Sequence, residues 1–81
     1  MKATALAPWR ERNPLRQWRR ANGHTVADAA VMLNTGVTTL TKWENGAATP
    51  SVDRMERIAA VTERSGIEQE WNTWQTEQRS A

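Results

Sequence analysis

Closely spaced signals that start and stop helices divide this chain. Two start signals have a capping side chain: Asn13 stands before Pro14, and Thr25 precedes Asp28 in an arrangement close to a capping box. The stop signals are residues that suit a left-handed or helix-breaking backbone: Gly23, Asn34, Gly46 and Gly66. A chain divided in this way is expected to fold as a compact bundle of five short helices.

Apolar residues recur at helical spacing within each segment. The predicted helices run from about residue 14 to 22, 25 to 33, 37 to 45, 50 to 62 and 67 to 78. The side chains expected to face the core are Leu15, Trp18, Ala29, Ala30, Leu40, Trp43, Val52, Met55, Ile58, Ala59, Thr62, Ile67, Trp71 and Trp74. We expect an N-terminal arm at 1–12, a helical domain at 13–65 and an amphipathic C-terminal helix at 66–81. Through Ile67, Trp71 and Trp74 the last helix either covers the domain as a lid or pairs with a second copy.

The net charge of +2 conceals an uneven distribution. Residues 1–24 hold six basic side chains against Glu11, a balance of +5, whereas residues 62–81 hold two arginines against four glutamates, a balance of −2. The basic side chains are Lys2, Arg10, Arg12, Arg16, Arg19 and Arg20. This basic end suits contact with a polyanion, and a solvated helix face accounts for it equally well. Within the arm, Arg10 and Arg12 could follow a phosphate backbone or enter a minor groove.

The residue types that the chain lacks exclude several classes of function. With no cysteine and one histidine, His24, it offers no thiolate metal site, and His24 is expected to be a half-exposed packing residue. An enzyme is not expected, because the sequence has no cysteine nucleophile and no glycine-rich phosphate loop. No apolar run approaches the roughly 20 residues that cross a bilayer. We therefore expect a cytoplasmic protein with no cofactor, small-molecule ligand or membrane partner.

The stretch "TTLTKWENG" at residues 38–46 has two contrasting faces. Leu40 and Trp43 lie three residues apart and point toward the core. The opposite face is short and polar and comprises Thr38, Thr41, Lys42 and Asn45. Threonine offers a hydroxyl group and a methyl group to base edges, and lysine donates to the acceptors of guanine, so this face suits a DNA groove. Glu44 lies at the edge of the buried side, where its carboxylate requires a cationic partner.

From about Asn13 to Val61 the sequence resembles the Cro/repressor type of helix-turn-helix domain, the xenobiotic-response-element family of bacterial and phage regulators. The matching residues are Trp18, Arg19, Gly23, Thr25, Ala30, Leu40, Trp43, "ENG" at 44–46 and "PS" at 50–51. The resemblance implies an all-α, lambda-repressor-like bundle of five helices that binds double-stranded DNA. It makes the helix at 37–45 the recognition helix.

The resemblance also assigns roles to individual residues. Val37, Thr38, Thr41 and Lys42 match positions that face base edges or phosphates, and Arg19 and Glu44 match a buried ion pair that orients two helices. Val26 stands where the family commonly has a glutamine that reaches a phosphate, which leaves Thr25 and the backbone amides near Val26 as the anchors there. The remaining candidates for DNA contact are Asn45, Arg16 and Arg20, of which the two arginines are expected on the outside of the first helix.

The function that follows is a sequence-specific transcriptional regulator, a repressor of phage, plasmid or mobile-element type that binds an inverted-repeat operator as a homodimer. Two alternatives remain: an antitoxin that represses its own operon, and a protein-interaction module on a helix-turn-helix scaffold. An apolar set favours a protein partner such as a toxin or an antirepressor: Val26, Val31, Met32, Trp71 and Trp74. Val31 and Met32 stand where polar residues are usual, and either they fill the core from a different direction or they form an exposed apolar patch.

Overall fold

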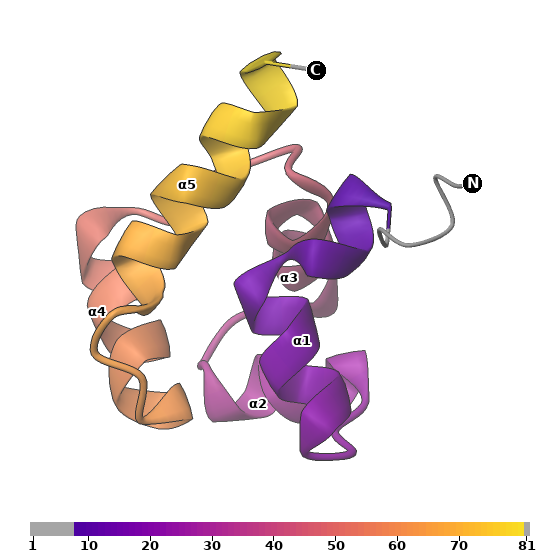
Figure 1. Cartoon of the computed structure of the whole chain (residues 1–81). Helices are drawn as coiled ribbons and strands as arrows, with labels where there is room; N and C mark the ends of the chain where they lie inside the picture. Colours follow the sequence, from indigo (N-terminus) through magenta and orange to yellow (C-terminus); the bar gives the residue numbers. More distant parts are fainter. Residues whose placement is uncertain (1–7, 81) are drawn as a thin grey trace.

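The structure is a computed structural model that describes residues 8–80 and their side chains as far as Gln78. Within these residues it contains a short 3-10 helix, five α-helices and no strand (Figure 1). The elements are η2 (Trp9–Arg12), α1 (Pro14–Ala21), α2 (Val26–Met32), α3 (Val37–Asn45), α4 (Val52–Thr62) and α5 (Ile67–Ser80). The predicted all-α architecture of five helices is confirmed. Residues 1–7 of the predicted arm, with Lys2, lie outside the described part of the chain.

Local hydrogen bonds set the helix boundaries. The side chain of Asn13 accepts a hydrogen bond from the amide of Arg16 (2.9 Å), which caps α1. The hydroxyl of Thr25 accepts from the amide of Asp28 (3.0 Å), and the Asp28 carboxylate accepts from the amide of Thr25 (3.2 Å), so the capping box is complete. Left-handed backbone occurs as predicted at Gly23, Asn34 and Gly46.

The end of α4 differs from the prediction. Glu63, rather than Gly66, adopts the left-handed conformation, with φ 58°, and α4 ends at Thr62. The amides of Glu63 and Arg64 donate to carbonyls of the last turn of α4, at Ala60 and Ala59. These hydrogen bonds satisfy the free carbonyls and replace the glycine as the stop signal.

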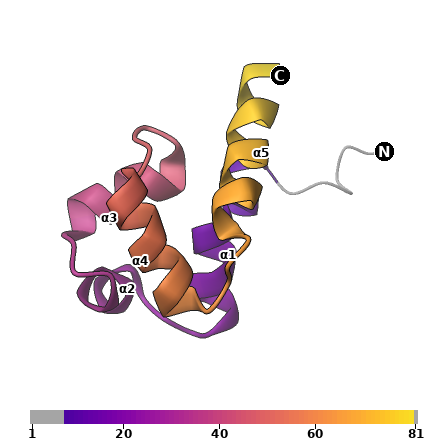
Figure 2. The same cartoon turned by 90° about the vertical axis from the view of Figure 1, so that its left-hand side faces the viewer.

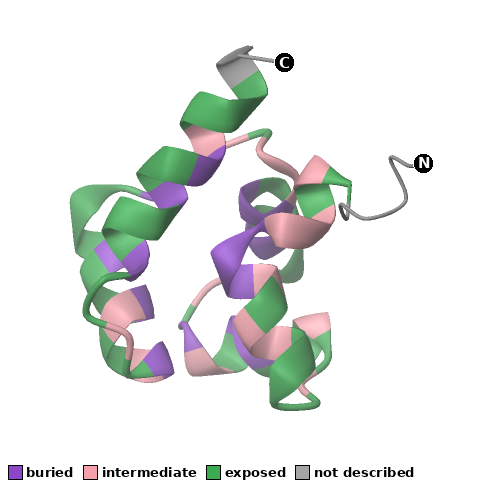
Figure 3. Cartoon of the chain, in the orientation of Figure 1, coloured by how far each residue is buried: buried purple, intermediate pink, exposed green. Residues whose placement is uncertain are grey.

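Every α-helix contributes side chains to one apolar core. The buried apolar residues are Leu15, Ala29, Ala30, Leu33, Leu40, Trp43, Met55, Ile58, Ile67, Trp71 and Trp74. In Figure 3 the buried segments of α1 and α5 face each other across the molecule. One predicted core residue, Val52, is wrong, since its side chain is 68% exposed, whereas Trp18 and Ala59 are half-buried and pack against the core. Val52 is the first residue of α4 and lies beyond the part of that helix that its neighbours cover.

The C-terminal helix packs along the domain rather than apart from it. α5 contacts η2, α1 and α4, and its C-terminal end extends beyond the other helices (Figure 2). Ile67, Trp71 and Trp74 are all buried within the single chain. These side chains are therefore part of the core and leave little surface for a second copy.

A pair of tryptophans fastens η2 to α5. The rings of Trp9 and Trp74 stack with centroids 3.8 Å apart and an interplanar angle of 2°. Each indole N–H donates to the backbone carbonyl of the other residue, and both donor–acceptor distances are 2.6 Å. Residues 9–12, predicted as part of a free arm, are thus packed on the last helix.

None of the described helices is long and apolar enough to cross a bilayer.

Gly46 lies directly beneath this tryptophan pair, at the end of α3. Its φ of 77° is left-handed, and a Cβ atom there would lie 2.9 Å from Cζ3 of Trp9 and 3.3 Å from Cη2 of Trp74. Such a distance to a ring carbon is too short, so the tryptophans would have to shift. Glycine at this position therefore both ends α3 and allows the tryptophan pair to pack against it.

Candidate nucleic-acid interface

The outer face of α3 presents short polar side chains to solvent. Thr38, Thr41 and Lys42 are exposed, and Leu40 and Trp43 beneath them are buried, as the sequence predicts. Among the described residues, no hydrogen-bond acceptor or carboxylate pairs with the side-chain ammonium of Lys42. A rigid helix with a free cation and threonine hydroxyls on its outer face can donate to base edges and phosphates.

A buried carboxylate connects α3 to α1. Glu44 is 1% exposed and accepts hydrogen bonds from Nε of Arg19 (2.8 Å), Nη2 of Arg19 (2.9 Å) and Nε of Arg16 (3.1 Å). The ion pair implied between Arg19 and Glu44 is thus present and bidentate, which fixes its geometry. Arg19 also donates to the carbonyl of His24 (3.2 Å), so one guanidinium fixes α1, the following turn and α3. The hydrogen bond to Glu44 raises the pKa of Arg19 although burial opposes it.

Arg16 does not lie on the outside of α1, so the predicted position is wrong. Its side chain is 14% exposed, and besides Glu44 it donates to Glu11 (2.9 Å) and to the side chain of Asn45 (3.0 Å). The length of the arginine side chain lets a residue beside the buried stripe of α1 reach the same carboxylate as Arg19. Asn45 is correspondingly half-buried and bound to Arg16, which takes its amide oxygen away from the outer face of α3.

The basic end of the sequence is largely neutralised within the chain. Its ion pairs are Arg12–Glu77, Arg16–Glu11, Arg16–Glu44, Arg19–Glu44 and Arg20–Glu11. Burial raises the pKa of Glu11, but hydrogen bonds and charge from Arg20 and Arg16 outweigh it, and the pKa is lowered. The +5 balance of residues 1–24 therefore overstates the positive charge that a polyanion would meet.

The N-terminus of α2 is already occupied by its own capping box. The amide and hydroxyl of Thr25 pair with Asp28, and Val26 is half-buried against the core. The hydrogen bond from the backbone amide of Thr25 lowers the pKa of Asp28. Asp28 thus places a negative charge beside the amides that the sequence suggested as phosphate anchors, and the Thr25 amide is not free to act as one.

The apolar residues of α2 and α3 are distributed unevenly. Val31 is 80% exposed, so the interpretation that it fills the core is wrong, whereas Met32 is half-buried. Val37, in the first turn of α3, is 49% exposed and can offer methyl groups beside the threonines. His24 is half-buried with its ring 5.2 Å from that of Trp18, which is the packing role predicted for it.

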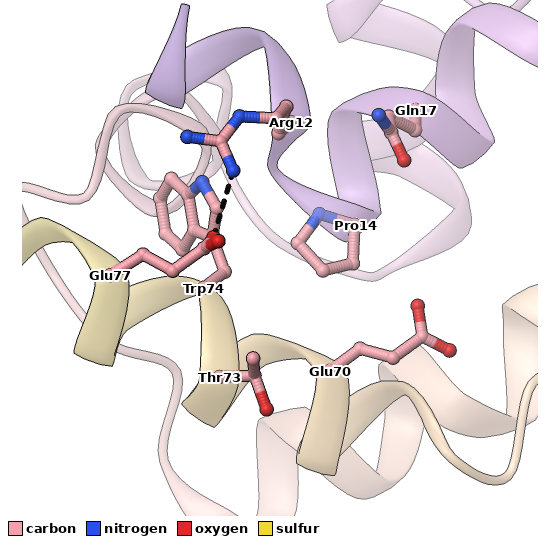
Figure 4. A pocket seen from close by; sticks show the side chains of 7 residues that line it. All are labelled: Arg12, Pro14, Gln17, Glu70, Thr73, Trp74 and Glu77. Atoms are coloured by element: carbon pink, nitrogen blue, oxygen red, sulfur yellow. Dashed lines mark hydrogen bonds and ion pairs between the residues drawn. The ribbon is translucent and has the colours of Figure 1, made fainter. Parts of the chain in front are cut away.

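A groove of about 360 Å³ lies between η2, α1 and α5 (Figure 4). The residues that line it are Arg12, Pro14, Gln17, Glu70, Thr73, Trp74 and Glu77. Arg12 spans it to Glu77, with Nη1 2.9 Å from Oε1, as the dashed line in Figure 4 shows. The outer face of α3 takes no part in this groove.

Among the residues that the structure describes, no three His, Cys, Asp or Glu side chains gather to hold a metal ion.

Three interactions could not be expected from local sequence patterns. Trp9 and Trp74 are 65 positions apart, and Glu11 joins Arg20 across the junction of two helices. The third is the hydrogen bond from Arg16 to Glu44, because a helical projection places Arg16 away from the core. The stretch "PWRER" at 8–12, in which a tryptophan precedes three charged residues, is the signal that favours a packed rather than a free segment.

Five short helices with an exposed polar third helix, fixed to the first by a buried ion pair, define a helix-turn-helix DNA-binding domain. A model of the helix-turn-helix family matches residues 15–68. The chain belongs to this family, in its Cro/repressor or xenobiotic-response-element type, and is a DNA-binding transcriptional regulator with the lambda-repressor-like fold. Comparisons with curated proteins and with solved structures gave no significant match.

Proposed function

We propose that this regulator is a repressor that reads an inverted-repeat operator with the outer face of α3. The observation that carries the proposal is Lys42, an unpaired cation between exposed threonines on a helix whose buried side is fixed by Glu44. A reading helix must hold its orientation while its outer groups remain free to bond, and α3 combines the two properties.

The contacts divide into base readout and backbone positioning. Val37 and Thr38, in the first turn, offer methyl and hydroxyl groups to base edges, and Lys42 donates to the acceptors of guanine. Thr41 lies beside them at the edge of the same face. At the start of α2, the capping box uses only the oxygen of the Thr25 hydroxyl, so its hydrogen can still be donated to a phosphate, and the backbone amide of Val26 lies outside that box. Arg16 and Asn45 support α3 from behind.

The small size of the reading surface favours a homodimer. One domain of this size contacts few base pairs, and two copies on half-sites about one helical turn apart supply the affinity that one lacks. Because Ile67, Trp71 and Trp74 are buried within each chain, the surface that joins the copies is formed by other residues. A dimer placed across a promoter excludes polymerase, and its control then rests on concentration or on a partner protein.

The test is selection of bound duplexes from a random pool, followed by footprinting and equilibrium sedimentation of the complex. We expect an inverted repeat protected as two half-sites, with two chains per duplex. A single chain on an asymmetric site would contradict the dimer, and recovery of no common sequence would contradict specific readout.

A second candidate is a regulator that also binds a protein, such as an antitoxin that represses its own operon. The exposed apolar side chains of Val31 (80%) and Val52 (68%) favour it, because DNA binding alone requires a polar and charged surface and gives no reason for exposed valines. The comparison is Val31→Ser beside the wild type. A variant that keeps operator affinity but loses repression in cells would indicate a protein partner, and unchanged repression would exclude one at this residue.

A further inference from the structure

Glu11 holds two arginines of α1 at the same time. Its Oε2 accepts a hydrogen bond from Nη1 of Arg16 (2.9 Å), and its Oε1 accepts from Nη1 of Arg20. Arg16 is itself held from the other side by Glu44 and Asn45. The carboxylate of Glu11 is therefore anchored on a fixed cation and is not a freely moving surface charge.

Arg20 is the member of this cluster that solvent reaches. Its side chain is 58% exposed, against 14% for Arg16 and 12% for Arg19. It lies on the last turn of α1, from which the chain turns directly into α2, the first helix of the helix-turn-helix (Figure 1). A phosphate that approaches this end of α1 meets a guanidinium that already faces a carboxylate.

We propose that Glu11 competes with DNA phosphate for Arg20 and so sets the affinity of the chain for DNA of any sequence. The inference rests on the proposed DNA-binding function. An incoming phosphate either displaces Glu11 from Arg20 or is repelled by it, and both weaken binding. Because phosphate contacts position a protein without reading sequence, Glu11 weakens operator and other DNA alike and leaves discrimination to α3. The chain is then held less tightly by the excess of unrelated DNA.

The experiment measures anisotropy of a labelled duplex of shuffled sequence with wild type, Glu11→Gln and Glu68→Gln at two salt concentrations. Each phosphate contact makes the logarithm of the binding constant fall with the logarithm of the salt concentration with a slope of about −0.9. With one additional contact, we expect Glu11→Gln to bind on the order of five- to tenfold more tightly at low salt, and this gain should shrink as the salt concentration rises. Glu68→Gln removes the same charge from the exposed side of α5 and should change affinity less than about twofold.

Arg20→Ala separates competition for Arg20 from a general change of charge. Placed in the Glu11→Gln chain, it should abolish the gain in affinity. In the wild-type chain it should have a small effect, because Glu11 already withholds the guanidinium from DNA. Circular dichroism confirms that each variant is folded. Should Glu11→Gln unfold, Glu11→Asp keeps the charge near Arg16, draws it back from Arg20 and should give a smaller gain.

The outcomes separate this inference from the function on which it rests. Glu11→Gln binding no more tightly than Glu68→Gln, or a gain that survives Arg20→Ala, overturns the role of Glu11 and leaves DNA binding intact. A folded wild-type chain that binds neither shuffled nor selected duplex at low salt overturns the proposed function, and this inference with it.

Discussion

Replacing Glu44 by glutamine should destabilise the domain strongly. Glutamine keeps the volume of the side chain but removes the charge that Arg19 and Arg16 surround with three hydrogen bonds. Breaking one side of a buried ion pair costs about 3–5 kcal/mol. Arg16 retains Glu11 and both arginines keep some solvent contact, so the lower end, about 3 kcal/mol, is expected. That corresponds to a fall in Tm of roughly 12–24 °C for a domain of this size.

The assay is urea unfolding followed by tryptophan fluorescence, with circular dichroism as the second probe of a two-state transition. Glu70→Gln is the matched control, because it removes the same charge from an exposed pair with Arg64. An exposed ion pair contributes about 0–1 kcal/mol. If Glu44→Gln lowers the free energy of unfolding no more than Glu70→Gln does, the carboxylate does not hold α3 and α1 together.

Three further substitutions should change the stability of the fold. Gly46→Ala should lower the free energy of unfolding by about 2 kcal/mol or more and alter tryptophan emission, because the added Cβ atom combines left-handed backbone strain with a clash against Trp9. Gly23→Ala is the control in the same urea titration, because Gly23 is also left-handed but has open space around it. The hydrogen bond from the Thr25 amide lowers the pKa of Asp28 from its ordinary value of 3.8. The charged Asp28 therefore stabilises the fold fully above about pH 4, and this stabilisation is lost as the pH falls through the folded-state pKa. Asp28→Asn should therefore destabilise the protein at neutral pH and lose its effect in acid, as unfolding at both pH values would show; an equal effect at both would contradict the charged cap. Trp71→Ala should cost about 3–5 kcal/mol in thermal unfolding without releasing folded monomers in sedimentation, whereas dissociation into stable monomers would place Trp71 at an interface.

The parts of the fold that depend on local signals could be predicted from the sequence. Asn13 and Thr25 cap their helices because a short side-chain acceptor reaches amides three residues ahead, and Gly46 ends α3 because it tolerates positive φ. The two faces of α3 follow from helical spacing, except that Asn45 is turned inward by its hydrogen bond to Arg16. The partner of Glu44 required more than spacing, and its assignment to Arg19 came from the family resemblance.

The parts that depend on distant contacts or on long side chains could not be predicted. Nothing near Trp9 indicates that its ring will stack on Trp74, because the stacking arises from how α5 crosses the bundle. Helical spacing predicts Arg16 on the outside of α1, because spacing locates the Cα atom and not the end of a long side chain. The exposure of Val31 likewise depends on which face of α2 the other helices cover, and hydrophobicity does not reveal that.

The most direct test of the account is the ratio of affinities for the selected operator and for its shuffled control, measured by anisotropy with wild type, Thr38→Ala and Lys42→Ala. Thr73→Ala, an exposed threonine on α5, is the matched control. If α3 reads DNA, the ratio should fall about tenfold for each α3 variant, since one base contact contributes about 1–3 kcal/mol of discrimination, and it should stay unchanged for Thr73→Ala. A ratio that survives both α3 substitutions in folded protein would contradict the claim that this face reads the operator.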